Sequence, residues 1–78
     1  MSTIFSKYFY QKVGTVRKQR AAIEKVLKAG PSSVTAIAES TGYEKELVLW
    51  NLMGMLRWGT IEVAGEEGHE LNYVLKEV

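Results

Sequence analysis

The chain has 78 residues, with ten Lys or Arg, nine Glu, one His, no Asp and no Cys, and its formal net charge is +1. Disulfides and thiolate metal sites are therefore excluded, and a lone His69 without any Asp is a poor basis for a His/carboxylate metal site. A domain of this length buries only about 60% of the surface that its unfolded chain exposes, so we expect a partner to add the stability that small domains otherwise gain from disulfides or metals.

The first segment, residues 1–14, is aromatic. If it is helical, one apolar stripe is formed by Ile4, Phe5, Tyr8 and Phe9. Lys7 and Lys12 interrupt the segment, which lacks the continuous apolar core of a signal peptide, and no stretch reaches the ~18 apolar residues of a membrane helix. We therefore expect a cytoplasmic protein with no membrane contact, a docking segment over 1–14 and a folded domain over 15–78.

The second segment, Val16 to Ala29, predicts a helix that ends at Gly30-Pro31. Apolar residues fall on one side of it, namely Val16, Ile23, Val26 and Leu27. Residues 1–28 hold seven of the ten cations and one of the nine Glu, so the molecule has a basic end and an acidic end. Candidate phosphate contacts on this helix are Arg17, Lys18, Arg20, Lys25 and Lys28. A solvated helix face or docking onto an acidic protein surface explains the same cations.

Two further helices are predicted. The first is short, over Ser33 to Thr41, because Ser32 or Ser33 can cap its start and Gly42 follows its end. The second, Glu44 to Trp58, is longer and ends before Gly59. Its core face is expected to hold Val48, Leu52, Met55 and Leu56.

The last segment predicts a β-hairpin. Ile61 and Val63 alternate with polar residues, and so do Leu71, Tyr73 and Leu75, while a glycine-bounded loop spans Gly65 to His69. His69 is the one candidate general base, but general-base catalysis needs a held partner and a substrate pocket. No nucleophile set and no phosphate-cradling glycine loop accompany it, so we expect no enzyme, no cofactor and no small-molecule substrate.

The order of these elements resembles that of a winged helix-turn-helix domain. The run from Val34 to Tyr43 is similar to the first helix and turn of that motif, with Ala38 at the close helix crossing and Gly42 at the turn. Residues 55–61 resemble the exit from the second helix into the wing. The resemblance implies an α+β fold with a three-helix core and a two-stranded hairpin wing, to which this chain adds an N-terminal helical segment. The chain departs from the motif at Asn51, because that position of the second helix is usually apolar.

The resemblance leaves two functions open. In a DNA-binding regulator, the longer helix and the wing approach the duplex and neutralise phosphates. Here that helix offers only Arg57 as a candidate phosphate contact. Its base-reading end carries Glu44 and Glu46, and the wing tip carries Glu66, Glu67 and Glu70, all of which repel phosphates. We therefore favour a non-catalytic adaptor or regulatory subunit that binds a protein partner or a second copy. DNA binding as a transcriptional regulator is the alternative.

The predicted protein interface is apolar and aromatic. It consists of Phe5, Tyr8, Phe9, Leu49, Trp50 and Met53. Trp is a favoured interface anchor, and the basic helix would add electrostatic steering. The competing interpretation is that the N-terminal segment covers Trp50 and Met53 within the same chain.

Overall fold

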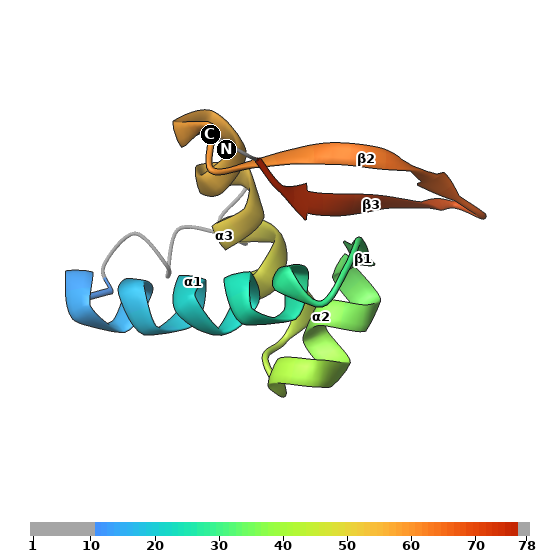
Figure 1. Cartoon of the computed structure of the whole chain (residues 1–78). Helices are drawn as coiled ribbons and strands as arrows, with labels where there is room; N and C mark the ends of the chain where they lie inside the picture. Colours follow the sequence, from blue (N-terminus) through green and yellow to red (C-terminus); the bar gives the residue numbers. More distant parts are fainter. Residues whose placement is uncertain (1–10, 77–78) are drawn as a thin grey trace, which may run out of the picture.

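The computed structural model describes residues 11–76, which form three helices and a three-stranded antiparallel sheet (Figure 1). The helices are α1 (Val13–Lys28), α2 (Val34–Thr41) and α3 (Lys45–Trp58). The strands are β1 (Ser32–Ser33), β2 (Ile61–Glu67) and β3 (Glu70–Leu75), in the spatial order β1-β3-β2. The predicted α+β class is confirmed. No helix in this part of the chain is long and apolar enough to cross a membrane.

The predicted helix ends are confirmed by their capping geometry. Ser33 Oγ accepts a hydrogen bond from the backbone N–H of Ala36 at 3.2 Å, which satisfies one of the free donors at the start of α2. Gly42 and Gly59 end α2 and α3 with φ values of 81° and 77°. Only glycine adopts this left-handed conformation without a steric penalty, so the two glycines define the lengths of both helices.

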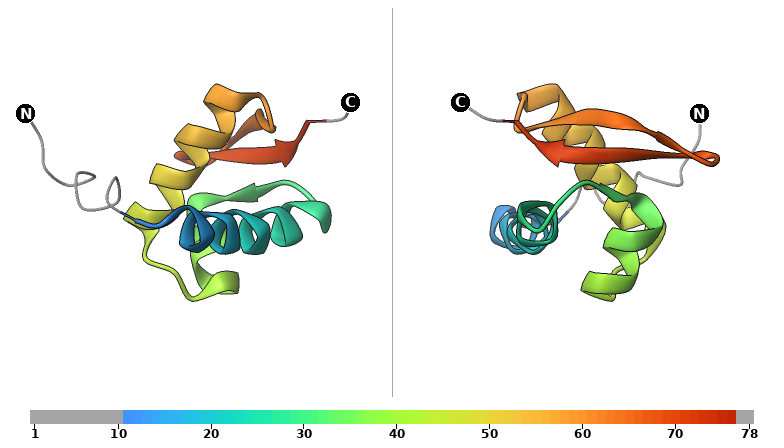
Figure 2. Two further views of the ribbon diagram at one scale, coloured as in Figure 1. Left: turned by 90° about the vertical axis from the view of Figure 1, so that its left-hand side faces the viewer. Right: turned by 45° about the vertical axis from the view of Figure 1, so that its right-hand side comes forward.

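The core is built by all three helices and one face of the sheet. Its buried apolar residues are Ile23, Leu27, Ile37, Ala38, Val48, Leu52, Met55, Ile61 and Tyr73. Ile61 begins β2 directly after α3, and Tyr73 lies in the middle strand, so the hairpin closes the core from one side. Both Figure 1 and the right-hand view of Figure 2 show the hairpin passing above α2.

The sheet differs from the predicted two-stranded wing. A third strand is present because Ser32 and Ser33 pair with Tyr73 and Asn72. Two polar residues in a turn-like sequence carry no alternation of apolar and polar side chains, which is why the pattern did not reveal them. The predicted Gly65–His69 loop is also wrong, because strand pairing continues to Glu67 opposite Glu70. A register shift between Val63 and Gly65 accommodates this longer pairing.

Two further expectations change at the helices. Leu56 was expected in the core, yet its side chain is 37% exposed, because it lies at the edge of the face of α3 that Val48, Leu52 and Met55 bury. The helix expected from Val16 begins earlier, at Val13. The predicted N-terminal helical segment lies almost wholly outside the described residues, and Lys12, immediately before α1, is extended rather than helical.

Candidate functional site

Asn51 joins α1 to α3 through a buried polar cluster. Its side chain is fully buried, and its Nδ2 donates to Gln19 Oε1 at 3.0 Å and to the backbone oxygen of Leu47 at 3.1 Å. Its Oδ1 accepts from Arg20 Nε at 3.1 Å. Gln19 is buried too, and its Nε2 donates to Gln11 Oε1 at 2.6 Å. The polar residue at a normally apolar place is therefore satisfied by partners on the facing helix.

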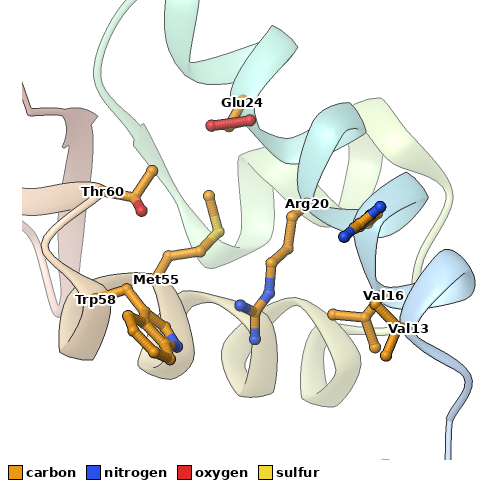
Figure 3. A pocket seen from close by; sticks show the side chains of 8 residues that line it. Val13, Val16, Arg20, Glu24, Met55, Trp58 and Thr60 are labelled. Atoms are coloured by element: carbon orange, nitrogen blue, oxygen red, sulfur yellow. The ribbon is translucent and has the colours of Figure 1, made fainter.

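Arg20 reaches from α1 across the surface of α3. Its guanidinium carbon lies 5.8 Å from the centre of the Trp50 ring, within the range of a cation–π contact. A Cβ placed on Gly54 would lie 3.2 Å from the same carbon and in collision with Arg20 Nη2. Gly54 thus provides the space through which the guanidinium passes, and Figure 3 shows Arg20 extending from α1 toward α3.

The outward side of α3 carries the predicted apolar surface. Met53 is 52% exposed, Leu56 is exposed, and Leu49 is half-buried. These three residues follow the spacing i, i+4 and i+7, so they form one continuous stripe along the helix. Trp50, three residues before Met53, is half-buried beside the stripe and is contacted by Arg20. We use the name α3 stripe for these three residues together with the adjoining Trp50.

The other half of the predicted interface cannot be placed. Phe5, Tyr8 and Phe9 lie outside the residues that the structure describes. The alternative in which the N-terminal segment covers Trp50 and Met53 therefore stays open. Residues 13 and 14 of the predicted docking segment belong to α1.

The cations of α1 lie mostly on its solvent-facing side. Arg17, Lys18, Lys25 and Lys28 are exposed, whereas Arg20 is half-buried and holds Asn51. Arg57 is exposed in the last turn of α3. Four of the six candidate phosphate contacts thus lie exposed along α1. The cations of α3 are Lys45 and Arg57, so the described structure does not gather the candidate contacts around α3.

The hairpin and the start of α3 are acidic. The exposed carboxylates of the hairpin are Glu62, Glu66, Glu67 and Glu70. Thr35 Oγ1 donates a short hydrogen bond to Glu70 Oε1, and this bond, together with Ser33 and the charge of Lys45, lowers the pKa of Glu70 below its ordinary value. Glu70 therefore stays ionised and links the hairpin to the first turn of α2.

A pocket of about 450 Å³ opens between α1 and the corner where α3 turns into β2 (Figure 3). Its lining combines apolar and charged side chains, namely Val13, Val16, Arg17, Arg20, Glu24, Met55, Trp58 and Thr60. Trp58 is 79% exposed and Val13 is 69% exposed. Reasoning from the sequence missed both residues, since each stands at a helix end where the periodic pattern stops.

The described residues contain no group of three or more His, Asp or Glu side chains that could hold a metal ion. His69 is exposed in the hairpin turn. No protein-family model, no curated protein and no solved structure matches the chain. The assignment of a function therefore depends on the surfaces themselves.

Proposed function

We propose that this protein is a small non-catalytic module of the winged helix-turn-helix type, an adaptor or regulatory subunit that binds a protein partner through the α3 stripe. The order of α1, β1, α2, α3 and the β2–β3 hairpin supports that fold type. The tight turn at Gly42 between α2 and α3 and the long hairpin after α3 support it as well.

The observation that carries the proposal is the exposed apolar stripe on α3. An exposed Met53 between Leu49 and Leu56 leaves a contiguous apolar surface on the helix. Covering one such side chain stabilises a complex by very roughly 1.5–3 kcal/mol. Contiguous exposed apolar surface on a small protein is typical of a protein-binding site.

Electrostatics supports a protein rather than a nucleic acid as the partner. Most of the affinity of a DNA-binding protein comes from neutralising phosphates. Glu44 and Glu46 stand at the start of α3, and the hairpin adds four exposed carboxylates. Lys45 and Arg57 are the only cations of α3, so a duplex placed against α3 and the hairpin would meet more carboxylates than cations.

DNA binding remains the second candidate, because four exposed cations lie along α1. This surface would place α1, rather than α3, against the phosphate backbone. In that case Lys25 and Lys28 would contribute to binding, and Met53 would not.

The test compares two variants that place a charge on an exposed apolar side chain. Met53→Glu alters the α3 stripe, and Leu71→Glu, at a side chain that is 41% exposed near the hairpin tip, is the matched control. We expect the wild type and Leu71→Glu to bind the same protein partner in a fixed stoichiometry, or to form a dimer that light scattering detects. Met53→Glu should lose that partner or that dimer.

The proposal is overturned if Met53→Glu binds the partner as well as the wild type does. It is also overturned if the protein shifts duplex DNA at near-physiological salt and the shift depends on Lys25 and Lys28 but not on Met53. Circular dichroism of each variant checks that the fold is retained.

A further inference from the structure

The pocket between α1 and the α3–β2 corner is a second surface, which adjoins the α3 stripe at Arg20, the pocket residue that contacts Trp50. Trp58 and Val13 stand at its rim, and Met55 and Val16 line it further in. Its volume of about 450 Å³ falls within the range of ~300–1,000 Å³ typical of ligand sites. Trp58 is more exposed than any other large apolar residue that the structure describes, and Trp is the residue type most enriched among interface anchors.

The charged side chains of the pocket favour an anionic ligand. Arg17 and Arg20 face one carboxylate, that of Glu24, so the lining has one more cation than anions. Within residues 11–76, neither arginine makes an ion pair with a carboxylate; Arg20 donates its Nε to Asn51 Oδ1 and lies against the Trp50 ring. Within the same residues the Arg20 Nη groups make no hydrogen bond, and the guanidinium lies beside Gly54 and the Trp50 ring.

Arg20 is also held in place before any ligand arrives. The hydrogen bond to Asn51 Oδ1 and the contact with the Trp50 ring restrain the guanidinium, so less side-chain freedom is lost on binding. A fixed guanidinium can bind a carboxylate through two parallel hydrogen bonds. Buried Asn51 therefore serves a binding group as well as the contact between helices.

We infer that this pocket binds an acidic peptide segment of the protein partner, with a large apolar side chain against Trp58 and Val13 and a neighbouring carboxylate on Arg17 and Arg20. This inference rests on the proposed function, since it names the chemistry of the partner. Charge complementarity selects the occupant: a neutral apolar segment would partly desolvate two guanidinium groups without giving either a carboxylate, and a basic one would be repelled.

The test uses a synthetic peptide that alternates Glu with Phe and Leu, titrated into the isotope-labelled full chain and followed by amide chemical shifts. A matched peptide has Gln in place of every Glu. We expect the acidic peptide to shift the amides around Val16, Met55 and Trp58, and the Gln peptide to bind at least about tenfold more weakly, which is about 1.4 kcal/mol.

Two variants and two controls locate the site. Arg17→Glu and Trp58→Ser should each weaken the acidic peptide by at least about tenfold. The exposed Lys28, at the other end of α1, provides the charge control Lys28→Glu, and Leu71→Ser on β3 provides the apolar control; both should bind as the wild type does. All four positions are exposed, so the amide spectra should stay dispersed.

Several outcomes overturn the inference. The acidic and Gln peptides could bind equally well, or Lys28→Glu could weaken the acidic peptide as much as Arg17→Glu does. Displacement of the acidic peptide by duplex DNA alone would be the third such outcome. If the peptide does not bind while Met53→Glu still releases the natural partner, the proposed function stands and this inference alone fails. If the peptide binds and Met53→Glu releases nothing, the α3 stripe fails and the pocket stands.

Discussion

The buried amide of Asn51 offers a quantitative test of how α1 and α3 are held together. Substitution of Asn51 by Ala removes the donor to Gln19 Oε1 and the acceptor of Arg20 Nε. The Leu47 carbonyl keeps its helical hydrogen bond. Gln19 is buried, so its carbonyl oxygen is left without a partner at a cost of about 1–3 kcal/mol. Arg20 is half-exposed, and water can replace its lost acceptor.

Two smaller effects enter the magnitude. The lost amide leaves a void at a fully buried position, which adds to the cost. Ala is a better helix former than Asn by up to about 0.7 kcal/mol, which offsets part of it. We expect Asn51→Ala to lower the free energy of unfolding by about 2 kcal/mol, out of the roughly 4–12 kcal/mol typical of a chain of this size.

Urea unfolding followed by circular dichroism measures this loss, and the melting temperature should fall by at least about 8 °C. Asn72, the other asparagine of the chain, is the matched control. Its side chain is half-buried, and its hydrogen bond within the described residues is a long one, 3.5 Å from Nδ2 to Glu67 Oε2. Asn72→Ala should therefore change the free energy of unfolding by less than about 0.5 kcal/mol. Adding Gln19→Leu to Asn51→Leu should recover stability, because both amides are then removed. Equal losses for Asn51→Ala and Asn72→Ala would refute the reasoning.

Three other predictions follow from single contacts. Gly54→Ala should stabilise the protein by up to about 1 kcal/mol in an Arg20→Ala background and by less in the wild type, because the Arg20 guanidinium must move away from the new Cβ; equal effects in both backgrounds in urea melts would contradict this. The carboxyl of Glu70 should titrate by NMR with a pKa below that of ordinary glutamates, and Thr35→Val should raise this pKa. Because the folded pKa is lowered, the contribution of Glu70 to folding stability is present above the unfolded pKa and is lost as pH falls through the folded pKa. An unchanged Glu70 pKa in Thr35→Val would contradict the assigned cause. Gly42→Ala should cost about 1 kcal/mol or more, since φ is 81° there; thermal melts that match the wild type would rule out the strained turn.

Periodicity and capping residues were enough to predict α1, α2 and α3, although not the start of α1 at Val13. Ser33, Gly42 and Gly59 are local signals that act through backbone geometry, so their positions in the sequence predicted the ends of α2 and α3 directly. Strand β1 was not predictable in this way, because its pairing with Tyr73 depends on a contact between residues far apart in the chain.

The candidate site was predictable only in part. Helical spacing correctly indicated that Met53 lies outside the core. The same spacing predicted Leu56 in the core, because a helical projection does not show where the elements packed against α3 end. The role of Asn51 and the path of Arg20 over Gly54 depend on how α1 crosses α3, and no property of either helix alone contains that information.

Site-specific photo-crosslinking in intact cells tests the central claim most directly. Benzoylphenylalanine in place of Met53 should form a discrete adduct with one polypeptide, and the same photoreactive residue in place of Lys25 on α1 should not. Adducts to DNA, or adducts at position 25 with none at position 53, would contradict the account.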